Sequence, residues 1–163
     1  MTSWGALTAA EPDFTHRLQE RFDAFLHKLL ATLRHDGSPR ISGIETTVHD
    51  GELWLPGMSA GRKFDDLRRD PRLALHSGSG DSDRADPGAW GGDAKIAGLG
   101  IEITDEVALE AYRDVVPGVP PGPFELFRVD IREAVLIRVG DPPDHLVIEH
   151  WHEGRGLQRV ERR

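Results

Sequence analysis

Apolar side chains recur with the period of an α-helix near the start of the chain. Four large apolar residues are spaced four apart and fall on one helical stripe: Phe14, Leu18, Phe22 and Leu26. Pro12 precedes them at a first-turn position, where proline is favoured because its missing N–H would have no partner there. The pattern predicts an amphipathic helix over about residues 12–27, with its stripe packed on a core or on a partner.

Beyond residue 27 the pattern changes to short apolar runs separated by turn signals. The pairs Asp36-Gly37 and Asp50-Gly51 are typical of tight hairpin turns, because both residue types tolerate positive φ. They separate three runs with strand character, over 29–33, 40–48 and 52–56. This part of the sequence predicts a three-stranded meander.

The rest of the chain predicts two more helices and several strands. A charged helix over 62–69 must end near Asp70, because Pro71 disfavours helical geometry in the residue before it. Two glycines in a strand over 94–103 indicate a bulge or a close backbone approach, and Thr104 suits the N-cap of a helix. The remaining elements are that helix to about residue 115, a strand over 73–76, a polar loop over 78–93, a proline-rich linker over 117–123 and late strands over 126–131, 134–139 and 145–149.

The order of these elements favours one fold class. The strands are joined by hairpins and do not alternate with helices as βαβ units, so a doubly wound parallel sheet is not expected. The sequence predicts a mainly β protein, an antiparallel barrel that is closed or nearly closed, with peripheral helices. We expect a single domain over 1–163, with the barrel over about 28–151.

Composition and charge narrow the function classes. The 163 residues carry a net charge of −8, which argues against general nucleic-acid binding. The chain has no cysteine, which excludes disulfides and thiolate metal sites. No apolar run is long enough for a membrane span, and the N-terminus has no signal-peptide pattern, so we expect a cytoplasmic protein.

The segment Ser59-Ala60-Gly61-Arg62-Lys63 has the character of an anion site. Small residues let the backbone turn tightly in front of a helix, and a helix N-terminus favours an anion. Arg62 and Lys63 add two positive charges at a helix start, where they oppose the macrodipole unless an anion offsets them. A phosphate site and an exposed helix with internal ion pairs to its own aspartates are both compatible with this sequence.

A metal site is not predicted. His150 and His152 share one face of a strand, but the sequence indicates no third ligand.

Several segments together resemble the pyridoxamine 5′-phosphate oxidase-like family, whose members are split barrels that bind FMN or the deazaflavin F420. The order and spacing of these segments carry the resemblance over most of residues 28–163. They are Leu30-Ala31-Thr32-Leu33-Arg34-His35-Asp36-Gly37-Ser38-Pro39-Arg40-Ile41-Ser42, Gly51-Glu52-Leu53-Trp54, Arg62-Lys63-Phe64-Asp65-Asp66-Leu67-Arg68-Arg69-Asp70-Pro71-Arg72, Gly92-Asp93-Ala94-Lys95-Ile96-Ala97-Gly98 and His145-Leu146-Val147-Ile148-Glu149-His150-Trp151-His152.

The resemblance implies a homodimer that binds its cofactor, FMN or alternatively F420, in clefts at the subunit interface. It implies that Arg62 and Lys63 contact the cofactor phosphate and that Arg40 is a further basic contact. It places other residues along the ring or the ribityl chain: Ser42, Gly57, Met58, Ser59 and Gly61. It also implies that Trp151 packs near the ring or the dimer interface.

Two departures from the family pattern bear on the activity. Glu45 stands where the oxidases often carry a basic residue, and the C-terminal Arg-x-His substrate element has no counterpart, since Gly154-Arg155-Gly156 does not match it. The resemblance therefore implies a flavin- or deazaflavin-dependent oxidoreductase acting on an unidentified small molecule, with no identified catalytic acid or base. The alternatives are a flavin-binding carrier without turnover and a split barrel that binds haem or another tetrapyrrole.

Overall fold

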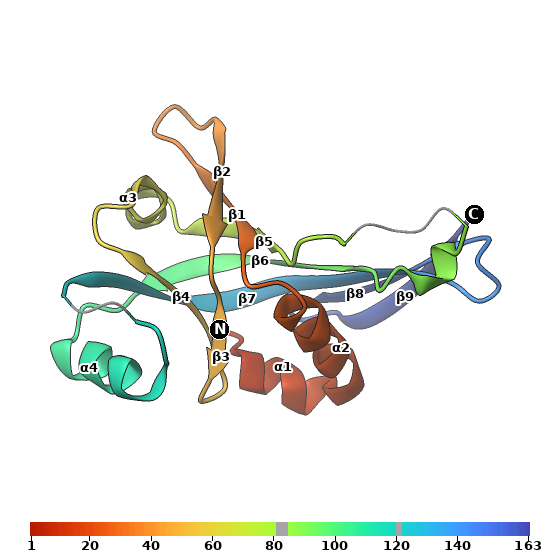
Figure 1. The fold of residues 1–163 in the computed structure, drawn as a ribbon, viewed down its shortest axis with the longest axis horizontal. Coiled ribbons are helices and arrows are strands. Elements are labelled where there is room, and N and C mark those ends of the chain that lie inside the picture. The colour runs from red at the N-terminus through yellow and green to blue at the C-terminus, as the bar shows by residue number, and fades with distance from the viewer. Residues whose placement is uncertain (81–84, 120–121) are drawn as a thin grey trace.

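The computed structural model describes residues 1–80, 85–119 and 122–163, and its strands form one antiparallel sheet (Figure 1). The strands are β1 (Lys28–Leu33), β2 (Pro39–Ile44), β3 (Thr47–His49), β4 (Glu52–Met58), β5 (Arg72–His76), β6 (Asp93–Glu102), β7 (Phe124–Val139), β8 (Leu146–His152) and β9 (Gly156–Arg162). The helices are α1 (Trp4–Ala10), α2 (Pro12–Asp23), α3 (Arg62–Arg69), α4 (Glu106–Val115) and a 3-10 turn over Pro87–Ala89. Among these helices, none is long and apolar enough to cross a bilayer.

The sheet closes on itself as a split barrel. Its main path runs β2-β1-β5-β6-β7-β4-β3, and β8 and β9 continue from β7 as a separate branch. Only Glu45 and Thr46 link β2 to β3, although these strands stand at opposite ends of the path. Two residues span about 7 Å, so the sheet must curl until its two ends meet.

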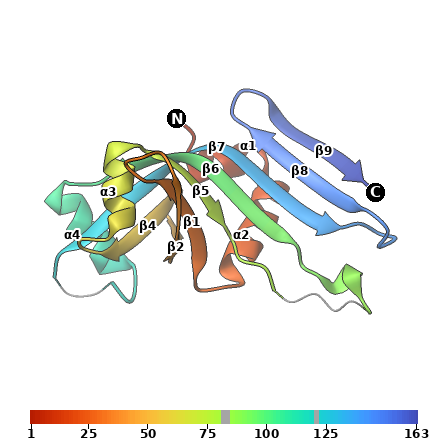
Figure 2. The same ribbon diagram turned by 90° about the horizontal axis from the view of Figure 1, so that it is seen from above.

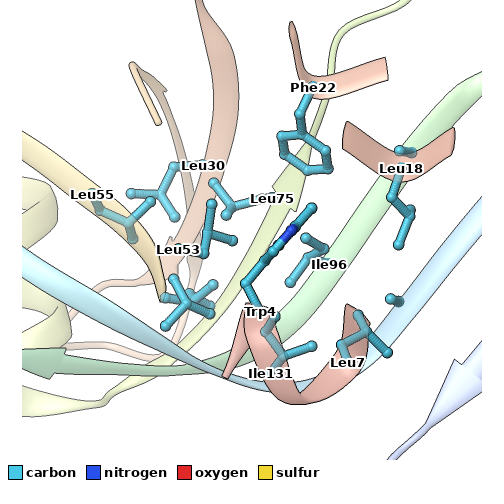
Figure 3. Packing of buried hydrophobic residues seen from close by; sticks show 14 of the residues in the cluster. Trp4, Leu7, Leu18, Phe22, Leu30, Leu53, Leu55, Leu75, Ile96 and Ile131 are labelled. Atoms are coloured by element: carbon cyan, nitrogen blue, oxygen red, sulfur yellow. The ribbon is translucent and has the colours of Figure 1, made fainter. Parts of the chain in front are cut away.

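The hydrophobic core fills the barrel and continues between the sheet and the N-terminal helices. Helices α1 and α2 lie on one side of β6 and β7 (Figures 1 and 2). Figure 3 shows side chains from these helices and from the strands converging in one cluster. The labelled members are Trp4, Leu7, Leu18, Phe22, Leu30, Leu53, Leu55, Leu75, Ile96 and Ile131.

The N-terminal region contains two helices where the sequence predicted one, over about residues 12–27. The predicted helix is α2, and the predicted position of its C-terminal end was wrong. Helix α2 ends at Asp23, and Leu26 is 66% exposed in the connection to β1. The sequence pattern also missed α1, whose N-cap Ser3 accepts a hydrogen bond from the Ala6 N–H. Trp4 of α1 meets Phe22 edge to face, with ring centroids 6.4 Å apart, so tertiary packing stabilises a helix too short to show a periodic stripe.

Both hairpins of the predicted three-stranded meander are present. The prediction that they share one continuous middle strand was wrong. The turn at Asp36-Gly37 joins β1 to β2, and the turn at Asp50-Gly51 joins β3 to β4. Asp50 and Gly51 both have positive φ, 49° and 70°. However, the run over 40–48 breaks into β2 and β3, because its two halves belong to opposite ends of the sheet path.

The central predictions agree with the structure. Helix α3 spans residues 62–69 and β5 spans 72–76. The register of β6 against β7 shifts between Ala97 and Gly98, which confirms the predicted bulge. A Cβ on Gly98 would lie 2.2 Å from the backbone oxygen of Asp130, so the strands can approach this closely only at glycine.

The C-terminal half departs from the prediction in three places. The two strands expected over 126–139 are one strand, β7, because its backbone pairs with β6 on both sides of the polar residues, with Arg132 as the extra residue at the register shift. Asp105, not Thr104, caps α4 by accepting from the Ala108 N–H. The structure also adds β9, which pairs with β8. Parts of the predicted loop over 78–93 and linker over 117–123 lie outside the described residues.

One face of the sheet carries a row of apolar side chains that are exposed or half-buried. Ile41, Ala31, Ala74 and Ala97 are direct cross-strand neighbours on β2, β1, β5 and β6. Ile41 is 73% exposed. We call Ile41, Ala31, Ala74 and Ala97 the open row.

Candidate functional site

Helix α3 is held on the barrel by two buried apolar side chains, Phe64 and Leu67. The Phe64 ring stacks on Phe127 of β7 with centroids 5.4 Å apart. Gly57 makes this possible, because a Cβ there would lie 2.5 Å from the Phe64 ring. Gly61 is almost as close, with an added Cβ 3.1 Å from the same ring. The two glycines therefore have a packing role that seats the start of α3.

Arg62 and Lys63 are adjacent in the sequence but line different hollows. Successive helical residues point about 100° apart, so the two cations diverge at the start of α3. Arg62 lines a polar hollow together with Arg40 of β2. Lys63 lines an apolar cleft together with Gly43 of the same strand. The two hollows thus share α3 and β2.

We call the polar one the arginine hollow. It has a volume of about 550 Å³ and is lined by Arg34, His35, Asp36, Arg40, Arg62, Asp65, Asp66 and Arg69. The Arg62 side chain is exposed and has no hydrogen bond or ion pair with another residue that the structure describes. A guanidinium at a helix start without a protein partner is available to an anion.

Asp66 organises the wall of the arginine hollow. Its side chain is 4% exposed and accepts from Arg40 Nε at 2.6 Å, from Arg69 Nη2 at 3.1 Å and from Thr32 Oγ1 at 2.9 Å. Burial by itself would raise the pKa of this carboxyl, but the hydrogen bonds from Arg40, Arg69 and Thr32 outweigh it and hold the pKa below its ordinary value. Asp66 is therefore charged at neutral pH.

The second hollow, which we call the apolar cleft, has a volume of about 390 Å³. Its wall is made mainly of seven apolar side chains: Ile44, Pro56, Met58, Val116, Pro117, Val119 and Phe124. Lys63 Nζ donates to the Gly43 carbonyl oxygen at 2.8 Å. Burial lowers the pKa of Lys63. A cleft of this volume is large enough for a planar ring ligand.

Glu45 and His27 stand together at the rim of the apolar cleft. His27 Nε2 lies 3.6 Å from Glu45 Oε1, and both side chains are more than half exposed. The carboxylate that departs from the family pattern therefore lies beside the cleft, where it adds negative charge.

The structure brings only some of the predicted site residues together. Gly57, Met58 and Lys63 line the apolar cleft, and Arg40 and Arg62 line the arginine hollow. Ser42, Ser59 and Gly61 line neither of these two hollows. Trp151 is 6% exposed and lies in the hydrophobic core. Its predicted contact with a ring or a dimer partner stays a prediction.

Sequence reasoning missed the residues that complete the two hollows. Asp66 and Arg69 lie three residues apart on α3, so their pairing could have been inferred from helical spacing. Val116 and Val119 come from the segment after α4, and nothing in the sequence places that segment against β2 and β4. Within the described residues, no group of three His, Asp or Glu side chains could hold a metal ion.

Comparison with known proteins then identifies the family. The model of the family described as pyridoxamine 5′-phosphate oxidase matches residues 14–137 of the chain. The chain belongs to the pyridoxamine 5′-phosphate oxidase family. The matched range contains α3, both hollows and all but the last two strands of the sheet. No curated protein matches the chain.

Several solved structures are similar to this chain in fold. A pyridoxamine 5′-phosphate oxidase-related, FMN-binding protein from Nostoc punctiforme is 14% identical, with a TM-score of 0.62 over 94% of this chain and 96% of that one. PhzG from Burkholderia lata, in complex with tetrahydrophenazine-1-carboxylic acid, is 15% identical, with a TM-score of 0.61 over 93% and 92%. ChuZ from Campylobacter jejuni is 12% identical, with a TM-score of 0.62 over 91% and 63%. At these identities the likeness concerns the fold.

The residues of this oxidase-family chain fit a phosphorylated ring cofactor. Arg62 offers a guanidinium that has no partner within residues 1–80, 85–119 and 122–163, and Arg40 presents a second one whose Nε is already anchored to Asp66. Guanidinium groups form the strong, charge-assisted hydrogen bonds that phosphate requires. The apolar cleft on the other side of α3 offers the mainly apolar wall that a flat ring prefers.

Proposed function

We propose that this protein binds FMN, or alternatively F420, and acts as an oxidoreductase on a small molecule in the cytoplasm. The observation that carries the proposal is Arg62, a cation in the arginine hollow without a partner in the described part of the chain, one residue before Lys63 in the apolar cleft. The phosphate is anchored by Arg62 and Arg40, and the ring occupies the apolar cleft. Membership of the family and an FMN-binding protein of the same fold support it.

The bound flavin-type ring supplies the hydride chemistry. The protein's own residues bind and orient the cofactor and shape the substrate space. Lys63 stands in the cleft as a cation whose amino group is fixed by the Gly43 carbonyl. Apolar side chains such as Val119 and Phe124 exclude water from the ring. Glu45 places a carboxylate at the rim, which disfavours a substrate anion on that side.

Replacing Arg62 with Gln tests the phosphate anchor. Loss of a charge-assisted contact removes about 1.5–3 kcal/mol, so we expect FMN affinity to fall about 10–150-fold. Riboflavin has no phosphate, and its affinity should stay within about twofold. Both are measured by quenching of flavin fluorescence in a titration. Arg72→Gln is the matched control, because Arg72 is an exposed arginine paired with Asp70 outside the hollow. If FMN binds Arg62→Gln as tightly as the control, the anchor is elsewhere.

The spectrum of the purified protein and its reduction distinguish the alternatives. A bound flavin that is reduced by a nicotinamide or by F420H2 and reoxidised by a substrate supports the oxidoreductase. A bound flavin that is never turned over indicates a carrier. A Soret band indicates a tetrapyrrole ligand and would overturn the proposal.

We also propose that a second copy of this chain covers the open row. Its centre is made of small apolar residues, Ala31, Ala74 and Ala97, which give a flat strip suited to close packing. Ile41 on the same row is two residues from Gly43, which lines the apolar cleft. Residues two apart share a strand face, so a partner on this row would also wall the cleft.

Replacing Ala74 with Glu tests this dimer. A buried, unpaired carboxylate at the centre of an interface is costly, so we expect the variant to be monomeric at concentrations where the wild type is dimeric. Light scattering coupled to gel filtration measures the mass. Val107→Glu on the exposed side of α4 is the control and should keep the wild-type mass. A wild-type protein that is monomeric would contradict the proposal.

A further inference from the structure

Asp66 ties α3 to β1 and β2, and it also has a place in the site that the phosphate anchor by itself does not require. It is a carboxylate in the wall of a hollow that is proposed to bind an anion. By charge alone it opposes that ligand, because like charges repel. It is also buried, and a buried charge is costly unless it is paired and hydrogen-bonded. The repulsion of the ligand and the burial of the carboxylate are both unfavourable. We therefore expect Asp66 to have a further role in the site.

The contacts of Asp66 define that role. Its two oxygens divide between two arginines: Oδ2 accepts from Arg40 Nε at 2.6 Å and from Thr32 Oγ1 at 2.9 Å, and Oδ1 accepts from Arg69 Nη2 at 3.1 Å. Arg69 Nη2 also donates to the Leu33 carbonyl oxygen. Three elements, β1, β2 and α3, therefore converge on one carboxylate.

Asp66 fixes one side of the guanidinium groups of Arg40 and Arg69, and the other side of each group is available to a ligand. Arg40 is held through Nε, and neither of its terminal nitrogens has a partner among the residues that the structure describes. Arg69 is held through Nη2, and it lines the same hollow as Arg40 and Arg62. Fixing a long side chain in advance removes the entropy that it would lose on binding an anion.

We infer that Asp66 is a positioning residue, which holds Arg40 and Arg69 in the orientation that binds the phosphomonoester end of the cofactor. Arg69 thereby becomes a third phosphate ligand beside Arg62 and Arg40. The inference rests on the proposed function. It predicts that the arginines held by Asp66 make the protein bind the phosphorylated form of a ring cofactor more tightly than the unphosphorylated form.

The sign of the effect separates positioning from simple charge. If Asp66 acts only as a nearby negative charge, Asp66→Asn removes repulsion and FMN binds more tightly. If Asp66 positions the arginines, the same substitution frees both side chains and FMN binds more weakly. Asp65→Asn is the matched control, because Asp65 lines the same hollow on the same helix but pairs with Arg68.

The readout is the ratio of the riboflavin to the FMN dissociation constant, measured by fluorescence titration at fixed salt. This ratio isolates the phosphate, because a general loosening of the fold weakens both ligands together. We expect the ratio to fall about tenfold in Asp66→Asn and to stay level or rise in Asp65→Asn. A ratio that stays level or rises in both variants overturns the role of Asp66.

A second pair of variants keeps the test decisive if Asp66→Asn fails to fold. Arg69→Gln leaves Asp66 bonded to Arg40 and Thr32, and it removes the proposed third ligand together with its bonds to Asp66 and to the Leu33 carbonyl oxygen. We expect its ratio to fall about tenfold against Arg72→Gln, and equal ratios in the two variants overturn the inference. A wild-type protein that binds riboflavin and FMN equally instead overturns the phosphate anchor of the proposed function, and the role of Asp66 with it.

Discussion

Phe64→Ala is expected to lower the free energy of unfolding by about 3–5 kcal/mol, since removal of a fully buried aromatic ring leaves a cavity. Phe64 is completely buried and stacks on Phe127. It also fills the space that Gly57 leaves open on β4. The substitution therefore removes the main apolar contact between α3 and the barrel, and we expect flavin affinity to fall together with stability.

Chemical denaturation followed by circular dichroism measures this loss. Val107→Ala is the control, because Val107 is 77% exposed on α4, and its effect should stay within about 0.5 kcal/mol. A loss below about 1 kcal/mol in Phe64→Ala would show that neighbouring side chains collapse into the space. In that case the seating of α3 depends on polar contacts such as those of Asp66.

Arg40→Ala is expected to cost about 3 kcal/mol of stability at neutral pH, because it removes one partner of a buried ion pair. Asp66 is 4% exposed and Arg40 22% exposed, with 2.6 Å between Oδ2 and Nε. The remaining contacts to Thr32 and Arg69 satisfy the carboxylate only in part. The same substitution removes one of the proposed phosphate ligands, so FMN binding should weaken as well.

The pH dependence of this loss has a definite sign. Burial acts to raise the pKa of Asp66, but the bonds from Arg40, Arg69 and Thr32 hold it below the ordinary value of 3.8. A folded-state pKa below the unfolded one gives stability that is present above the unfolded pKa and is lost as the pH falls through the folded pKa. The difference between wild type and Arg40→Ala should therefore be largest at neutral pH and should shrink below about pH 3.8.

Denaturation curves at a series of pH values measure this difference. Arg34→Ala is the control in the same hollow, because the Arg34 side chain donates to Ser38 Oγ and to the Pro39 carbonyl oxygen in the exposed turn. Its effect should stay within about 0.5 kcal/mol at every pH. A difference between wild type and Arg40→Ala that is independent of pH would mean that the loss comes from packing of the arginine stem and not from the charge of Asp66.

The structure shows where the two departures from the family pattern lie, Glu45 and the segment Gly154-Arg155-Gly156. Glu45 lies at the rim of the apolar cleft beside His27. The segment Gly154-Arg155-Gly156 forms the turn into β9, where Gly154 and Gly156 adopt positive φ of 79° and 72°. This turn therefore serves the β8–β9 hairpin.

Local sequence determined the elements whose signals are local. Asp50 and Gly51 tolerate positive φ and made their turn. Pro71 ended α3 at Arg69, and Gly98 marked the bulge because no other residue fits against Asp130 there. The cations Arg62 and Lys63 could also be found from the sequence, because they stand at a helix start where an anion is favoured.

Tertiary structure alone decided which residues meet. The chain reads as one strand over 40–48, yet the two halves close opposite ends of the barrel, and closure depends on the whole sheet. Arg62 and Lys63 are neighbours in sequence, yet their side chains line two different hollows, because successive residues of a helix point in different directions. Asp66 reads as one more surface charge on a charged helix. Only the approach of β1 and β2 buries it and gives it Thr32 and Arg40 as partners, because desolvation and long-range pairing are properties of the packed chain.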